Sequence, residues 1–241
     1  MTDVLVIGDS CQDIFIYGNC QRMCPDAPVP IFLPTQIKKN GGMAANVAAN
    51  LKSLGVQCDL VSNLEEIEKT RYIDEKTNHM FLRVDSNEEN IERIKILNKE
   101  MISKYKLIVI SDYNKGFLAD EDIDFICTNH DNVFIDTKKI LGKWYTKAKF
   151  IKINEKEYMK TKFTLEGEKN IIVTLGALGC RHLNKVFAVK KVDVKDMSGA
   201  GDTFLSGLVA KYLKTNNINK SIIFANECAT KVVQQRGVNV I

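Results

Sequence analysis

Short apolar runs recur along the chain, and each ends close to a polar residue. An apolar run of this length, bounded by turn residues, is typical of a strand buried on both faces of a parallel sheet. Helix-compatible segments such as 88–103 and 120–129 lie between several of the runs. This alternation predicts an α/β fold in which a mostly parallel sheet is flanked by helices. The runs are VLVIGD to Asp9, CDLVSN to Asn63, LIVISD to Asp112, NVFID to Asp136, FIKIN to Asn154 and IIVTLG with Thr174.

The polar residues at these strand ends are candidates for a ligand site. In an open α/β sheet, ligands bind beyond the carboxyl ends of the strands. Asp and Asn at such positions also start turns and cap helices, and for any single residue that explanation is as good. For five together at one edge we favour a site. The five are Asp9, Asp112, Asp136, Asn154 and Thr174.

Two segments, 13–37 and 70–85, depart from the alternation of strands and helices. Each has a strand-like pattern and no helix-compatible stretch. In the second, YIDEKTNHMFLRV predicts a hairpin with its turn between Asp74 and Asn78. Together they predict a small β-lid over the carboxyl edge of the sheet. The chain has no internal repeat, low-complexity tract or Pro/Gly/Ser-rich linker. We therefore expect residues 1–241 to form a single domain.

Composition and charge narrow the classes of protein. The 241 residues are 45% hydrophobic, and the net charge of +4 comes from interleaved acidic and basic residues, which argues against nucleic acid as a partner. The chain has no apolar stretch of about 18 residues, and acids occupy its amino terminus. We therefore expect no membrane insertion and a cytoplasmic protein.

The cysteines favour a reducing compartment. There are seven, an odd number at irregular spacing, so they do not form a disulfide framework. Cys20 and Cys24 are close enough to share a metal, but no second ligand pair follows them. We interpret them as free thiols rather than as a zinc site.

The segment GGMAANVAANLKSLG at 41–55 predicts a helix entered through a tight turn. Apolar residues from Met43 to Leu54 have helical spacing, and Gly55 is a natural stop. Gly and Ala in the first turns allow backbone to approach a small ligand, and Asn46 offers a donor and an acceptor. Taken alone, such a helix indicates tight packing more often than binding.

The segment DMSGAGDTFLSGLVAKYL at 196–213 is more informative. Gly199, Ala200 and Gly201 precede a helix, and the bare backbone N–H groups of a helix start favour an anion. Asp202 sits where a phosphate would be received, although a carboxylate there can also act only as a cap. Phosphoryl transfer needs a cradle for the transferred group and a base at the nucleophile, and this motif supplies both.

Together the two segments resemble the signatures of the ribokinase-like (PfkB) carbohydrate kinases, with a GG-x-A-x-N-x-A helix followed by GAGD and a second helix. The resemblance implies a ribokinase-like fold and ATP-dependent phosphorylation of a sugar hydroxyl. It implies that Asp202 is the catalytic base. The residues implied in the anion hole for the γ-phosphate are Gly199, Ala200 and Gly201, and those implied to hold the sugar are Asp13, Gly41, Gly42 and Asn46. Asp9 lies closer to its strand and is interpreted as structural.

Further motifs resemble the nucleotide half of that family's site. NEKE resembles an N-x-x-E element, which implies that Asn154 and Glu157 organise Mg²⁺ and the phosphates. VTLGALG resembles the nucleotide-binding loop, which implies contacts from Thr174, Gly176 and Gly179. ANECATKVVQQRG is similar to the segment beside adenine and makes Asn226 a weaker contact. The family binds ATP without a Walker motif, and none is present.

A narrower resemblance concerns the acceptor. CPDAPVPIF, SDYNKG, IDTK and the TRYID…FLRVD hairpin resemble the kinase module that phosphorylates the anomeric hydroxyl of D-glycero-D-manno-heptose 7-phosphate in the ADP-heptose pathway. The link from Asn63 to Thr70 is shorter than in that group, so a peripheral helix and strand are expected to be missing. No cytidylyltransferase module is expected after Ile241. Five basic residues are candidates for holding a second anion at the mouth of the site, namely Arg22, Arg71, Arg83, Lys115 and Lys138.

Other functions stay open at this point. The two signatures specify the chemistry but not the acceptor, so a kinase for another sugar, sugar phosphate or nucleoside is the first alternative. A non-catalytic sugar-binding relative is the second, although it would not need the base. A dinucleotide-binding oxidoreductase would need G-x-G-x-x-G after the first strand, which is absent. The shortened link leaves a sheet edge less covered, from which we predict a homodimer through the lid or this edge.

Overall fold

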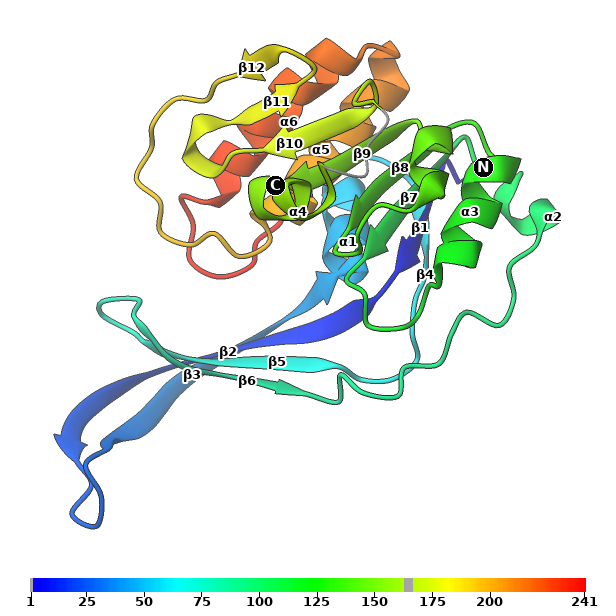
Figure 1. The fold of residues 1–241 in the computed structure, drawn as a ribbon. Helices are drawn as coiled ribbons and strands as arrows, with labels where there is room; N and C mark the ends of the chain where they lie inside the picture. The colour runs from blue at the N-terminus through cyan, green and yellow to red at the C-terminus, as the bar shows by residue number, and fades with distance from the viewer. Residues whose placement is uncertain (1, 163–166) are drawn as a thin grey trace.

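The main sheet of the computed structural model, which describes residues 2–162 and 167–241, has eight strands (Figure 1). Six of its strands run parallel, namely β4, β1, β7, β8, β9 and β10, and β11 and β12 are antiparallel additions at one edge. The predicted parallel α/β sheet is confirmed. In spatial order the strands are β12 (Lys185–Phe187), β11 (Cys180–His182), β10 (Ile171–Thr174), β9 (Phe150–Asn154), β8 (Val133–Thr137), β7 (Leu107–Asp112), β1 (Val4–Gly8) and β4 (Cys58–Val61).

Helices cover both faces of this sheet, and the two-residue period of the strands decides which side chains meet which helices. Val4 and Val6 of β1 pack in one core cluster with residues of α1 (Ala44–Ser53), α5 (Ala200–Thr215) and α6 (Ile218–Val232). Leu5 and Ile7 pack on the opposite face with residues of α2 (Lys99–Ile102), α3 (Asp120–Asn129), α4 (Glu155–Thr161) and the 3₁₀ helix η1 (Lys143–Lys147). Both faces of the parallel sheet are therefore buried.

The lid is a second, four-stranded sheet that extends away from the body (Figure 1). Its spatial order is β3 (Pro30–Met43), β2 (Ser10–Met23), β5 (Glu68–Asp74) and β6 (Met80–Ser86). The predicted turn lies after Asp74, whose Oδ2 accepts a hydrogen bond of 2.7 Å from the Thr77 backbone, and Asn78 has a positive φ of 62°. The strands run beyond the predicted segments on both sides. Gly41 and Gly42 belong to the end of β3 rather than to a turn before α1.

One predicted helix is largely wrong. Of the segment 88–103, only α2 is an α-helix. Asn87 and Asn90 have left-handed backbone, and the Ile94 N–H donates to the Phe117 carbonyl instead of continuing a helical ladder. The side chain of Asn98 then caps α2 by accepting from the Met101 N–H. Asparagine tolerates the left-handed region, so an apolar spacing compatible with a helix is overridden here by tertiary contacts.

The other edge of the main sheet is short and lightly covered. Within the ranges that the structure describes, strand β4 pairs only with β1, and residues 62–67, which connect it to β5, hold neither helix nor strand. Among the described residues, no helix has the length and apolarity to cross a membrane.

Candidate active site

Asp202 lies in the first turn of α5, where that helix packs against α1. Gly199 precedes the helix with a φ of 75°, a left-handed conformation that suits glycine. The hydroxyl of Ser206 donates to the Val47 carbonyl at 3.1 Å and so joins the two helices. Asp202 is only 4% exposed. The packing of two small-residue helices thus places a carboxylate at a buried helix start.

Two neutral donors hold the Asp202 carboxylate. Asn46 Nδ2 donates to Oδ2 at 2.8 Å, and the Tyr113 hydroxyl donates to Oδ1 at 2.8 Å. The Asn46 amide is itself oriented, because its Oδ1 accepts from Asn50 Nδ2 at 3.0 Å. Asn46 was predicted to hold the sugar, and in the structure its amide nitrogen contacts Asp202. Each carboxylate oxygen still has a lone pair for a further hydrogen bond.

Burial raises the pKa of Asp202 to about 6. The hydrogen bond from Asn46 opposes this rise, the negative charge of Asp136 adds to it, and the Lys152 ammonium lowers the pKa again. A carboxylate with a pKa near 6 is mostly ionised at neutral pH and retains appreciable proton affinity. The site therefore has the properties of a general base.

A buried ion pair lies beneath the glycine segment. Lys152 Nζ and Asp136 Oδ2 are 2.6 Å apart, with side chains 4% and 2% exposed. A Cβ added to Gly201 would lie 2.9 Å from Lys152 Nζ, so this ammonium group lies against the backbone of the segment. Asp136 Oδ1 is buried and has no hydrogen-bond partner among the described residues. A cation thus reinforces the N–H groups at the start of α5 as an anion site.

Asp9 organises the loop that carries Tyr113. Its buried carboxylate accepts hydrogen bonds from the backbone N–H groups of Tyr113, Lys115 and Phe117 at 2.7, 3.3 and 3.3 Å. Asp112 is used in the same region, where it accepts from the Asn114 N–H and from the Thr137 hydroxyl. Both strand-end carboxylates therefore shape the loop between β7 and α3.

Asn154 and Glu157 form a capping box at the start of α4. Asn154 Oδ1 accepts from the Glu157 N–H at 2.9 Å, and Glu157 Oε2 accepts from the Asn154 N–H at 2.7 Å. The second Glu157 oxygen pairs with Lys138 Nζ at 2.5 Å. Burial opposes protonation of Lys138, yet the charge of Asp136 and the bond to Glu157 raise its pKa. Lys138 therefore links Asp136 of β8 with the carboxylate on α4.

The residues of the predicted nucleotide loop lie at the end of β10 and just after it, next to β9 with Asn154. Thr174 ends β10, and Gly176, with φ 59°, begins the short 3₁₀ helix η3 (Gly176–Leu178). A Cβ on Gly179 would come within 2.1 Å of the Phe187 carbonyl, which makes glycine necessary there. Asn226 Nδ2 donates to the same carbonyl at 2.8 Å and is buried. Gly179 and Asn226 therefore support the β11–β12 hairpin.

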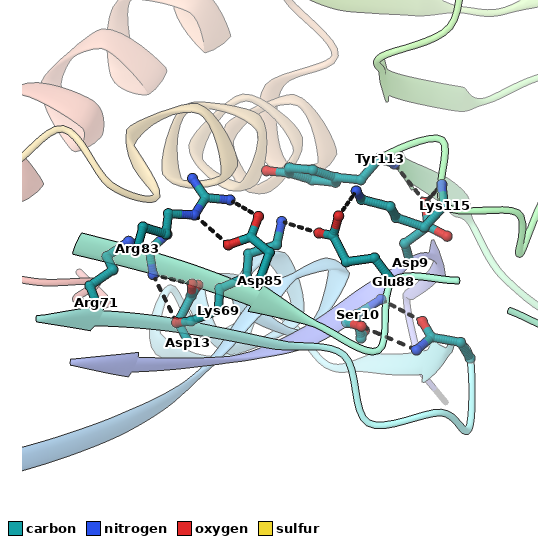
Figure 2. A network of polar contacts seen from close by, with 11 residues as sticks. Asp9, Ser10, Asp13, Lys69, Arg71, Arg83, Asp85, Glu88, Tyr113 and Lys115 are labelled. Carbon is teal, nitrogen blue, oxygen red and sulfur yellow. Dashed lines mark hydrogen bonds and ion pairs between the residues drawn. The ribbon is translucent and has the colours of Figure 1, made fainter. Parts of the chain in front are cut away.

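The inner face of the lid carries a network of charged side chains (Figure 2). Arg71 Nη1 and Asp13 Oδ1 are 2.5 Å apart, and Gly42 packs so closely on this pair that its Cβ would lie 2.3 Å from Asp13 Oδ2. Arg83 makes two hydrogen bonds of 2.7 Å to Asp85. Lys69 and Lys115 both pair with Glu88.

Four of the five predicted basic residues lie in or near this network, and each has an acidic partner: Arg71, Arg83, Lys115 and Lys138. Arg22 does not join them, because it lies exposed near the far end of β2. Gly41, the other predicted glycine of the sugar side, packs close to Ala45 at the end of β3.

The sequence patterns did not identify two residues of the site, Tyr113 and Lys152. Tyr113 stands in SDYNKG, a segment that contributed only to the family resemblance. Lys152 interrupts the apolar run FIKIN. A lysine inside a strand buried on both faces needs a counter-ion, and that conflict is the signal that could have identified it.

The chain belongs to the pfkB family of carbohydrate kinases, whose model matches residues 67–240. It is 28% identical over 287 aligned positions to the bifunctional protein HldE of Nitratiruptor sp. and 30% identical over 297 positions to that of Helicobacter acinonychis. These alignments cover 97% and 98% of the chain but only 62% and 64% of the relatives, so the chain spans less than two thirds of their length.

Solved structures show the same fold. Ribokinase from Thermotoga maritima matches with a TM-score of 0.73 at 17% identity, over 99% of this chain and 95% of that one. Phosphofructokinase-2 from Escherichia coli, in complex with potassium, matches with a TM-score of 0.71 at 13% identity, over 100% and 95%. The ribokinase of Arabidopsis thaliana, complexed with ribose and ATP, has a TM-score of 0.69 at 14% identity, over 98% and 94%. The chain thus combines membership of the pfkB carbohydrate kinase family with a ribokinase-like fold.

Proposed function

We propose that the protein transfers the γ-phosphoryl group of ATP to a sugar hydroxyl, with Asp202 as the general base. The observation that carries the proposal is a buried carboxylate at the start of α5, held by two neutral donors and with its pKa raised to about 6 by burial. It stands directly beside a glycine segment backed by a lysine ammonium group. Base and anion site therefore adjoin, as in-line phosphoryl transfer requires.

In the proposed reaction, Asp202 takes the proton of the acceptor hydroxyl while the sugar oxygen forms a bond to the γ-phosphorus. The bond between that phosphorus and the bridging oxygen of ADP breaks, and ADP leaves with the electron pair. The N–H groups of Gly199, Ala200 and Gly201, with the Lys152 ammonium beside them, stabilise the charge on the transferred group. The proton passes from Asp202 to solvent after release.

Magnesium fits the carboxylates at this edge. Asp136 has one buried oxygen with no partner in the described part of the chain, and Glu157 presents a second carboxylate that Lys138 also faces. Hard oxygen ligands of this kind suit Mg²⁺, which keeps several waters and binds the phosphates directly. No group of three or more metal-ligating His, Cys, Asp or Glu side chains occurs in the described ranges. Because so few protein ligands are available, the ion would keep most of its waters. We propose that Glu157 and Asn154 position this hydrated Mg²⁺, which would neutralise phosphate charge.

ATP would extend from the start of α5 toward η3. Thr174, Gly176 and Gly179 would line the nucleotide site, with Asn226 beneath it, as the family resemblance implies. A similar fold occurs in a ribokinase complexed with ribose and ATP. The phosphates of ATP would then lie over Gly199–Gly201. We place the reaction in the cytoplasm, where ATP is available.

The acceptor is proposed to be D-glycero-D-manno-heptose 7-phosphate, phosphorylated at its anomeric hydroxyl. The resemblance to the heptose 7-phosphate kinase module and the similarity to HldE proteins support this. Arg71 and Arg83 are register partners across β5 and β6, so both side chains lie on the inner face of the lid. Two guanidinium groups there suit a phosphate held away from the γ-phosphate. Asp13, Gly41, Gly42 and Asn46 would hold the sugar.

A turnover assay tests this proposal. ATP is supplied with Mg²⁺ and a panel that contains heptose 7-phosphate, its dephosphorylated form, other sugar phosphates, neutral sugars and nucleosides. We expect the heptose 7-phosphate to give the highest kcat/KM. Equal or better use of the dephosphorylated sugar would move the acceptor to a neutral sugar or nucleoside. Binding of a sugar without turnover of any acceptor would identify a non-catalytic relative.

A further inference from the structure

Tyr113 lies in the loop between β7 and α3, and its hydroxyl donates a hydrogen bond to the Asp202 carboxylate at 2.8 Å. Its backbone N–H is fixed by the buried carboxylate of Asp9 at 2.7 Å. Its ring lies under two ammonium groups, with Lys69 Nζ 5.4 Å and Lys138 Nζ 5.2 Å from the ring centroid. Main chain, ring and hydroxyl are thus each held by a different group.

The geometry points to Tyr113 as a positioning residue that orients the carboxylate of Asp202 toward the acceptor hydroxyl and keeps that carboxylate ionised. This inference rests on the proposed role of Asp202 as base. Asn46 binds one carboxylate oxygen and Tyr113 the other, so together they fix the plane of the group. Without Tyr113 the carboxylate could rotate about its Cβ–Cγ bond, a broad torsion.

Tyr113 acts as a donor over the working pH range. Burial, with the charge of Asp202 as the next cause, raises its own pKa well above the usual value, so the phenol keeps its proton. A donated hydrogen bond favours the ionised form of the acceptor. Tyr113 therefore lowers the pKa of Asp202, against the rise that burial causes. The other titratable groups that face Asp202 are Cys11 of β2, Asp136 of β8, Lys138 after β8 and Lys152 of β9.

The contact also joins the lid to the base. Lys69 belongs to β5 and reaches the Tyr113 ring from the lid, while Lys138 reaches it from the body. Figure 2 shows Tyr113 above the lid network, next to the Lys69–Glu88–Lys115 group. The position of the hydroxyl therefore depends on both parts of the molecule that enclose the acceptor.

Tyr113→Phe removes the hydroxyl and leaves the ring in place. We expect kcat at pH 8 to fall about ten-fold. The pKa of Asp202, about 6, predicts an acid limb of kcat/KM at that pH for the unchanged protein. In the variant this limb should move up by about one pH unit, since a hydrogen bond to a charged group has this strength. The sign follows from the active form: activity needs the ionised carboxylate, and loss of a donor raises its pKa. KM for ATP should stay the same.

Two controls make the test specific. Tyr105→Phe also removes a tyrosine hydroxyl that donates to a carboxylate, Asp59 at 2.8 Å, but outside the site, and should change neither kcat nor the pH profile. In an Asp202→Asn background, Tyr113→Phe should cause no further loss of kcat, because residues that act through one group are non-additive. An unmoved acid limb, or an additive loss in the double variant, would overturn the inference. Full activity of Asp202→Asn alone would instead overturn the proposed base.

Discussion

Two buried carboxylates of the site, Asp202 in the body and Asp13 in the lid, have similar exposure and opposite partners. Asp202 is 4% and Asp13 6% exposed. Asp13 is paired with the guanidinium of Arg71, whereas Asp202 is bound by an amide and a phenol and, among the described residues, has no cation within ion-pair distance. Neutral donors orient a carboxylate without cancelling its charge, and its proton affinity survives. The same residue type thus suits a reactive base in one place and a fixed binding group in the other.

This contrast extends to the two parts of the molecule. The inner face of the lid pairs nearly every charge with its opposite, as Arg83 with Asp85, where the hydrogen bond to the arginine keeps the pKa of the carboxyl low. At the edge of the body, by contrast, Asp202 has no cationic partner and Asp136 Oδ1 has no hydrogen-bond partner within residues 2–162 and 167–241. Under the proposed function, the body would carry out the chemistry and the lid would recognise the acceptor.

Asp202→Asn removes the proposed base of the body and should have the largest effect on kcat. Asparagine keeps the shape of the side chain but cannot take the proton, so kcat should fall by about 10²- to 10⁴-fold. ATP binding, measured by calorimetry, should be unchanged. Asp131→Asn, a change at an exposed position, is the matched control. Near-normal turnover of Asp202→Asn would show that another group is the base.

Arg71→Ala and Arg83→Ala test the lid as the recognition side. Loss of a charge-assisted contact to phosphate costs about 1.5–3 kcal/mol, so KM for the sugar phosphate should rise about 10- to 100-fold. Arg71 should give the larger change, because its side chain is 12% exposed against 41% for Arg83.

KM for ATP serves as the internal reference for these lid variants and should not move. Arg93→Ala, which breaks an ion pair with Asp122 outside the lid, should leave both constants unchanged. If the two lid variants lowered kcat with unaltered KM, the lid would contribute to the chemistry rather than to recognition.

Glu157→Gln tests whether the carboxylate of Glu157, in the body, positions Mg²⁺. Glutamine can keep the capping box of α4, so the fold should persist, but the carboxylate charge beside Lys138 is lost. The Mg²⁺ concentration for half-maximal activity should rise, by roughly ten-fold for a group that orients the hydrated ion. Glu155→Gln in the same helix turn is the control. Superimposable magnesium titrations would remove Glu157 from this role.

Local patterns in the sequence were enough to predict the strands, the lid and the position of Asp202 at a helix start, because each depends on a periodicity or a short motif. The partners of these residues depend on tertiary structure. Tyr113 and Asp202 are 89 residues apart, and Arg71 and Asp13 are 58 apart, so no local pattern shows that they meet. The prediction of a helix over 88–103 is largely wrong for the same reason, since the Ile94 N–H donates to the carbonyl of the distant Phe117.

The outer face of the lid carries a row of apolar register partners across all four strands: Ile37 of β3, Ile16 of β2, Tyr72 of β5 and Leu82 of β6. Ile37 and Leu82 are 59% and 55% exposed.

A contiguous apolar face of this kind is typical of an association surface, so we predict a homodimer that covers it. Leu82→Glu places a charge in the row and should shift the protein to a monomer in light scattering at high concentration. The effect on kcat should be the smallest of the series, because the row lies on the face opposite Arg71 and Arg83. Met159→Glu, at an exposed apolar position on α4, is the control and should leave the dimer intact. A monomeric unchanged protein would contradict the prediction, whereas a dimer that persists in Leu82→Glu would point to the β4 edge instead.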